Sequence, residues 1–153
     1  MLRNTTLFFI AFVFGFYSCD PCNNLDCLSS NYFGQFRIVS TSDGRDLVFG
    51  AGSRYNSKTI QFYSLNGNDT SYYDYKPLRF PGCGHVSILY VYFYPETNKP
   101  VYMKLSDTDT DTLHLTYNAF KSRCCGIITS IQSFQYNNEA VIENGKGTLV
   151  LKK

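Results

Sequence analysis

The chain has 153 residues, and its 14 lysine and arginine residues nearly balance its 12 aspartate and glutamate residues. No basic cluster is longer than the pair Lys152-Lys153, so the sequence lacks the positive patch of a nucleic-acid-binding protein. The length suits one domain with a substantial core and leaves no room for a second.

The first residues predict an export signal. Arg3 is the only charge before an unbroken apolar run at 7–17. As a helix this run would cover roughly 16 Å, about half of the hydrocarbon core of a bilayer, which fits a signal peptide better than a membrane span.

The run ends in Phe16-Tyr17-Ser18-Cys19, which resembles a lipobox, although Tyr17 is larger than the residue usual at that place. We therefore predict that residues 1–18 are a lipoprotein signal peptide and that Cys19 is the lipid-bearing first residue of the mature protein. An ordinary secretory signal cleaved elsewhere, or an uncleaved anchor, is the alternative.

The mature part predicts strands and turns, with no helix. After a polar tether at 19–31, aromatic and β-branched residues gather in short segments between turn signals, a pattern typical of strands. The predicted strands are 35–40, 46–49, 59–65, 71–76, 86–94, 101–105, 112–117, 127–136, 140–143 and 148–152.

Three local features refine this prediction. The Asp43-Gly44 pair predicts a hairpin between the first two strands. Strand 71–76 is expected to end before Pro77, because proline cannot donate to a ladder. Both faces of 86–94 are apolar, which favours a central strand buried on both sides.

We expect about eight or nine of these segments to form strands, which predicts an all-β fold. We expect residues 32–153 to form a single antiparallel β-sandwich, immunoglobulin-like or transthyretin-like, with a closed barrel as the alternative.

Six segments of the chain resemble those of a known family. The segments that carry the resemblance are Phe36-Arg37-Ile38-Val39, Asp43-Gly44-Arg45-Asp46-Leu47, Leu89-Tyr90-Val91, Asp109-Thr110-Asp111-Thr112-Leu113, Cys124-Cys125-Gly126 and Ile131-Gln132-Ser133-Phe134-Gln135-Tyr136-Asn137. Together they resemble the small uncharacterised all-β lipoproteins of Bacteroidota-type bacteria. The resemblance implies a cell-envelope protein that is lipid-anchored to the outer membrane. It implies no activity.

The six cysteines indicate an oxidising compartment. If Cys19 carries lipid, five thiols remain, and their connectivity cannot be deduced from the sequence. We expect a disulfide from Cys83 to Cys124 or Cys125. Of the other three cysteines, Cys22 and Cys27 are close enough in the tether to pair locally.

The sequence does not predict a metal site. Cys83, His85 and Cys124-Cys125 lack the paired knuckles of a zinc site. The series Asp107-x-Asp109-x-Asp111 begins like a calcium loop, but Thr112 stands where an EF-hand has glycine, so a polar, solvent-facing turn is the preferred interpretation. The same Thr112, within Asp111-Thr112-Leu113, is a candidate O-glycosylation site.

The functional expectation is a non-catalytic module without a cofactor. His85 and His114 are the only histidines, and no nucleophile elbow is present. His114 falls on the outward phase of its predicted strand, so we expect it to be exposed. Surface tyrosines, with Tyr72, Tyr73 and Tyr75 as candidates, would contact an envelope protein or a glycan. The alternative is a small enzyme inhibitor, because the segment 50–55 is similar to the inhibitory loop of periplasmic lysozyme inhibitors.

Overall fold

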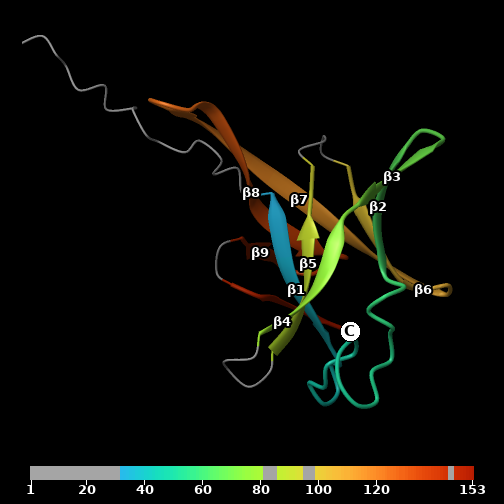
Figure 1. Ribbon diagram of the computed structural model, residues 1–153. Coiled ribbons are helices and arrows are strands. Elements are labelled where there is room, and N and C mark those ends of the chain that lie inside the picture. The colour runs from blue at the N-terminus through green and yellow to red at the C-terminus, as the bar shows by residue number, and fades with distance from the viewer. Residues whose placement is uncertain (1–31, 81–85, 95–98, 145–146) are drawn as a thin grey trace, which may run out of the picture.

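The computed structural model describes residues 32–80, 86–94, 99–144 and 147–153. These residues form ten strands and no helix, which confirms the all-β prediction (Figure 1). The strands are β1 (Phe33–Val39), β2 (Gln61–Asn66), β3 (Asp69–Tyr73), β4 (Tyr75–Phe80), β5 (Val86–Tyr92), β6 (Val101–Ser106), β7 (Asp109–Ser122), β8 (Gly126–Tyr136), β9 (Val141–Glu143) and β10 (Leu149–Lys152). The predicted signal peptide and tether lie outside the described residues.

The strands make two sheets. One has the order β10-β1-β5-β4, and the other has the order β3-β2-β6-β7-β8-β9. All ladders between these strands are antiparallel except one, because β1 pairs with β10 in parallel. The expectation of a purely antiparallel fold is wrong for this pair. β1 and β10 are far apart in the sequence, so no tight hairpin forces them to run in opposite directions.

The core lies between the inner faces of the two sheets. Phe36 of β1 stacks on Phe62 of β2 at 6.3 Å between ring centroids and meets Phe134 of β8 edge-on at 5.3 Å. Gly34 makes room for this ring, because a Cβ at Gly34 would lie only 2.4 Å from Cζ of Phe36. Aromatic contacts therefore join the sheets at a point where one strand has no side chain.

The predicted strand at 46–49 is wrong. Asp46 makes one isolated bridge to Val39, and the chain then bends. The cause is local: Oδ1 of Asp46 accepts hydrogen bonds from the backbone nitrogens of Val48 and Phe49 at 2.9 and 2.8 Å. A side chain that binds its own backbone in this way competes with a sheet ladder.

The predicted strand 71–76 is two strands. The chain passes from one sheet to the other at Asp74, between β3 and β4. Pro77 lies inside β4 and was expected to end the strand. It is tolerated because β4 is at the edge of its sheet, where half of the backbone groups need no ladder partner.

The strand predicted at 86–94 is central, as expected, because β5 lies between β1 and β4. Leu89, Val91 and Phe93 are fully buried on its inner face. On the outer face the prediction of burial is correct for Ile88, which is fully buried, and wrong for Tyr92 and Tyr94, which are exposed.

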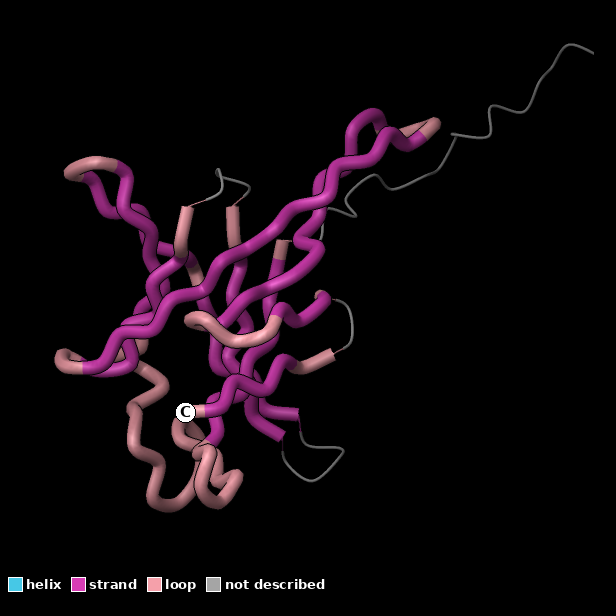
Figure 2. Tube along the Cα trace, turned by 180° about the vertical axis from the view of Figure 1, so that it is seen from behind, coloured by secondary structure: helices cyan, strands magenta, loops and turns pink. Residues whose placement is uncertain are grey.

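β7 and β8 are much longer than their neighbours. β6 pairs with β7 only at residues 109–113, and β9 pairs with β8 only at 133–135. The segment 117–131 is therefore a two-stranded ribbon, which we call the arm. It projects from the body of the molecule (Figure 2).

Candidate functional site

Three tyrosines form a row across the outer face of the six-stranded sheet. The ladders place Tyr63 of β2 opposite Tyr72 of β3 on one side and opposite Tyr102 of β6 on the other. The ring of Tyr63 stacks on Tyr102 at 5.3 Å and lies 6.0 Å from Tyr72. Tyr72 is 62% exposed. The row crosses three strands and so spans about 10 Å, and the exposed ring of Tyr72 lies at one end of it.

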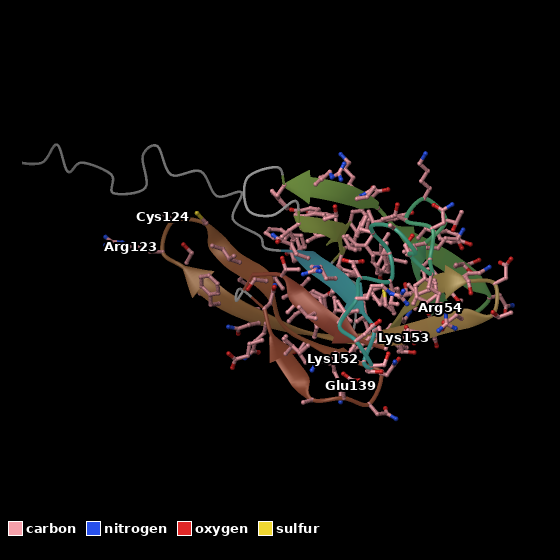
Figure 3. The ribbon with its side chains drawn as sticks, turned by 90° about the horizontal axis from the view of Figure 1, so that it is seen from below. Arg54, Arg123, Cys124, Glu139, Lys152 and Lys153 are labelled. Carbon is pink, nitrogen blue, oxygen red and sulfur yellow. The ribbon has the colours of Figure 1, made fainter. Side chains whose placement is uncertain are left out.

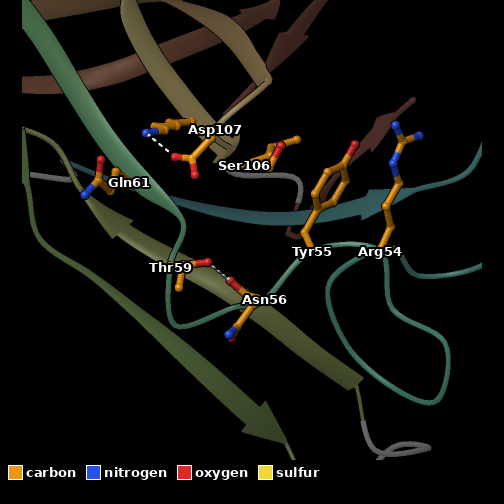
Figure 4. A pocket seen from close by; sticks show the side chains of 9 residues that line it. Arg54, Tyr55, Asn56, Thr59, Gln61, Ser106 and Asp107 are labelled. Atoms are coloured by element: carbon orange, nitrogen blue, oxygen red, sulfur yellow. Dashed lines mark hydrogen bonds and ion pairs between the residues drawn. The ribbon is translucent and has the colours of Figure 1, made fainter.

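A polar pocket adjoins this row (Figure 4). Its volume is about 490 Å³. Gln61 and Lys104 are in register with each other and two residues from Tyr63 and Tyr102, so they share the outer face with the row and also line the pocket. The lining is Arg54, Tyr55, Asn56, Thr59, Gln61, Lys104, Leu105, Ser106 and Asp107.

The charged groups that line the pocket are the Lys104–Asp107 ion pair and the guanidinium of Arg54. Nζ of Lys104 lies 2.8 Å from Oδ1 of Asp107, whose side chain is 95% exposed. This contact raises the pKa of Lys104 and lowers the pKa of Asp107, since each charge favours the other. The guanidinium of Arg54 lies 5.5 Å from the ring centre of Tyr55, within cation–π range. The pocket thus offers amide, hydroxyl and charged groups to a polar ligand.

Behind the pocket, Lys153 binds two carboxylates, the partly buried Asp109 and the buried Asp111. Its Nζ lies 2.6 Å from Oδ1 of Asp109 and 2.6 Å from Oδ2 of Asp111. Tyr55 donates its hydroxyl to Asp109 at 2.6 Å, and Tyr136 donates its hydroxyl to Asp111 at 2.7 Å. These residues come from the 40–60 loop, β7, the end of β8 and the residue after β10, so the network joins four parts of the chain.

The network shifts the pKa of several of its members. Burial alone would raise the pKa of Asp109, but hydrogen bonds from Lys153 and Tyr55 outweigh it and hold that pKa below its usual range. Burial likewise opposes the charge on Lys153, yet its two carboxylate partners raise its pKa. The pKa values of Tyr55 and Tyr136 are raised, first by burial and then by the carboxylate that each contacts.

This geometry corrects the interpretation of Asp107-x-Asp109-x-Asp111 as a solvent-facing turn. Only Asp107 points into water; Asp109 and Asp111 lie within β7 and face inward, because alternate residues of a strand share a face. An ammonium group already lies between the two inner carboxylates. Among the described residues, no group of three histidine, cysteine or acidic side chains is placed to hold a metal ion.

The other predicted sites are distributed over the molecule. Thr112, the candidate glycosylation site, is half-buried on the outer face of β7, directly opposite Tyr102. His114 is exposed two residues further along, as its strand phase predicted. Cys124 and Cys125 lie in the turn at the tip of the arm, whereas Cys19, Cys22, Cys27, Cys83 and His85 lie outside the described residues. The disulfides therefore stay predictions.

Of the three candidate surface tyrosines, one is largely exposed. Tyr72 is exposed, Tyr73 is buried and donates its hydroxyl to Ser64, and Tyr75 is half-buried. Sequence reasoning missed Tyr63 and Tyr102 as partners of Tyr72. The signal was present in the alternation of TIQFYSL and VYMKLS, which places these tyrosines on the polar faces of their strands, but the pairing of the strands was not known.

The segment 50–55 is a loop of turns and bends, with Arg54 exposed. Tyr55 is buried and bound to Asp109, so this part of the loop is held to the domain.

In the part of the chain that the structure describes, no helix is both long and apolar enough to pass through a bilayer. Comparisons with protein-family models, with curated proteins and with solved structures find no match to this chain.

Proposed function

We propose that this protein is a lipid-anchored, non-catalytic module of the cell envelope that binds a glycan on the outer face of its six-stranded sheet. The observation that carries the proposal is the tyrosine row, Tyr72-Tyr63-Tyr102, beside the polar pocket. Sugars have apolar C–H faces and hydroxyl edges, so they need an aromatic ring and a set of hydrogen-bonding groups at the same time.

The two parts of the site match these two needs. Tyr72 is largely exposed, so a ligand can reach its ring, and the mutually stacked Tyr63 and Tyr102 are partly exposed beside it. Gln61 and Lys104 continue the same face into the pocket, where amide and charged groups can bind hydroxyls in several directions. A row across three paired strands is also rigid, which lowers the entropic cost of binding.

Within the same proposal, the two sheets form an immunoglobulin-like or transthyretin-like sandwich, residues 1–18 are a signal peptide, and Cys19 carries the lipid that holds the domain on the outer membrane. The aromatic core between the sheets and the unbroken apolar run at 7–17 support these points. A binding module on a tether would gain avidity from many copies on one membrane.

The glycan is tested by titrating purified protein against an array of bacterial and plant polysaccharides, followed by calorimetry with the best binder. We expect Tyr72→Ala to weaken binding about tenfold, the effect of losing one aromatic contact. Tyr92→Ala is the matched control, because Tyr92 is also exposed but lies on the other sheet.

Equal losses in the two variants would place the binding surface elsewhere, and a folded protein that binds no glycan on the array would refute the proposal. The alternative, a small enzyme inhibitor, is measured in parallel. Inhibition of lysozyme that is lost in Arg54→Ala and kept in Tyr72→Ala would favour the loop 50–55 over the tyrosine row.

The anchor has its own test. Cys19→Ala should release the protein from membranes or leave the precursor uncleaved. Unchanged processing together with unchanged partitioning into detergent would refute the lipoprotein assignment without bearing on glycan binding.

A further inference from the structure

The arm has a surface unlike the rest of the molecule. Near its tip, Ile127 is 76% exposed and Phe120 is 50% exposed. Because residues directly opposite in the ladder share a face, Ile127 lies on one face of the ribbon with Lys121. Phe120 lies on the other face with Ile128, which is itself buried. Bulky apolar side chains are therefore offered to solvent on both faces of a two-stranded ribbon, where neither neighbouring sheet strand covers them.

The charge of the arm has one sign. No aspartate or glutamate occurs between Thr112 and Asn138, and the charged residues near the tip are Lys121 and Arg123. Both are exposed. Figure 3 shows Arg123 at the end of the arm, away from Arg54, Lys152 and Lys153 in the body of the molecule. Cations beside exposed apolar side chains are the combination that binds the interface of an anionic bilayer.

The base of the arm lies next to the point where the described chain begins. The backbone nitrogen of Phe93 donates a hydrogen bond to the carbonyl of Tyr32 at 2.6 Å. Tyr94 follows Phe93 in the chain, and its carbonyl accepts a hydrogen bond from the hydroxyl of Tyr117 at 3.4 Å. Beyond Tyr117 the arm extends about 20 Å, at 3.4 Å for each residue. The 13 residues from Cys19 to Asn31 can span at most about 45 Å. A lipid on Cys19 would therefore hold the arm within reach of the bilayer.

We infer that the tip of the arm, residues 120–127, is a membrane-contact element that docks on anionic lipid headgroups. Lys121 and Arg123 bind the headgroups, and Phe120 and Ile127 enter the boundary between headgroups and acyl chains. The position of the arm relative to the bilayer rests on the proposed lipid anchor; its affinity for anionic lipid does not. Contact at two points, lipid and arm, would fix the orientation of the glycan-binding face relative to the membrane.

The absence of tryptophan from the sequence allows a direct test. In the full chain, made without acylation, Phe120→Trp provides a single tryptophan at the tip, and Phe80→Trp provides one at an exposed position on β4. We expect vesicles of phosphatidylcholine with phosphatidylglycerol to shift the emission of Phe120→Trp to shorter wavelength. Vesicles of phosphatidylcholine alone should give little shift, and Phe80→Trp should not respond to either.

Charge reversal completes the test. In the Phe120→Trp background, Lys121→Glu with Arg123→Glu should weaken the vesicle affinity at least tenfold. Lys152→Glu with Arg54→Glu changes the net charge equally at the other end of the molecule and should leave the affinity unchanged. The apolar run at 7–17 can bring the whole chain to vesicles; a chain that sediments with them while Phe120→Trp does not shift would overturn the inference. An equal shift on neutral vesicles, or equal losses in the two charge reversals, would overturn it as well.

Discussion

Nζ of Lys153 lies between the two carboxylate oxygens of Asp111, 2.7 Å from Oδ1 and 2.6 Å from Oδ2. The carboxylate side chain is 8% exposed, so the ion pair is largely removed from water. The contact joins the residue after β10 to β7 and therefore ties one sheet to the other. Lys153 also contacts Asp109, so one ammonium group pairs with two of the three carboxylates in the Asp107-x-Asp109-x-Asp111 series.

Removal of the ammonium group should destabilise the fold strongly. Lys153→Met leaves the partly buried Asp109 and the buried Asp111 near each other with no cation between them, and breaking a buried pair in this way costs about 3 kcal/mol or more. Urea unfolding at neutral pH measures the change. Lys152→Met is the matched control, because Lys152 is exposed and should tolerate the substitution within about 0.5 kcal/mol. Similar midpoints for the two variants would contradict the assigned role.

Calcium should leave the melting temperature unchanged within about a degree, compared with a chelator. Calcium needs six or more oxygen ligands, and here it would have to displace Lys153 from both carboxylates. Scanning calorimetry in millimolar calcium checks this. A rise of several degrees that Asp109→Asn abolishes would show that these carboxylates form a calcium site.

Stability should fall as the pH rises above about 10, the usual pKa of tyrosine. The pKa values of Tyr55 and Tyr136 are raised in the folded state, and burial raises the pKa of Tyr117 to about 12. A folded-state pKa above the unfolded one gives stability that is complete below pH 10 and is lost as the pH rises toward the folded value.

The measurement is the urea midpoint at pH 8 and pH 11. Tyr136→Phe should lower the midpoint at pH 8, because Asp111 loses a hydrogen bond, and should reduce the drop between pH 8 and pH 11. A wild-type midpoint that is constant over this interval would contradict the prediction.

Gly34→Ala should destabilise the domain by about 1–3 kcal/mol, the usual cost of overpacking a core. The added methyl would meet the rings of Phe36 at 2.4 Å and Phe134 at 3.1 Å. Gly67→Ala is an instructive comparison, because nothing lies within 4 Å of its Cβ and only its φ of +63° is unfavourable. Near-UV circular dichroism should report disturbed aromatic packing in Gly34→Ala and not in Gly67→Ala.

A disulfide from Cys83 to Cys124 or Cys125 would close a loop of some forty residues and stabilise the domain by about 4 kcal/mol in the chain-entropy model. The tip of the arm and the ends of β4 and β5 that flank Cys83 lie at opposite ends of the molecule (Figure 1), so this linkage would require the two segments to approach each other. Mass spectrometry of non-reduced protein from an oxidising compartment should find this linkage. Five unmodified thiols in such material would show that the prediction is wrong and would favour the alternative of a zinc site at these cysteines.

Several features of this protein follow from the sequence because they depend on residues that are near each other in the chain. The strands β2, β5, β6 and β8 match their predicted segments closely, since alternation of apolar and polar side chains is a local pattern. The same local pattern correctly predicts that His114 is exposed. The hydrogen bonds from the backbone of Val48 and Phe49 to Asp46 are also local, yet they compete with strand propensity, and the sequence alone does not show which of the two wins.

The candidate site was decided by tertiary structure. Tyr63 and Tyr72 are close in the sequence, but Tyr102 joins them only because β2 pairs with β6. Likewise, Lys153 and Asp109 are 44 positions apart and meet only when β10 and β7 are placed in facing sheets. Local alternation in the sequence determines which side of each strand is polar and which is apolar. Strand order depends instead on the packing of the whole core, which no local pattern records. Only the tertiary structure therefore decides which residues of different strands lie side by side.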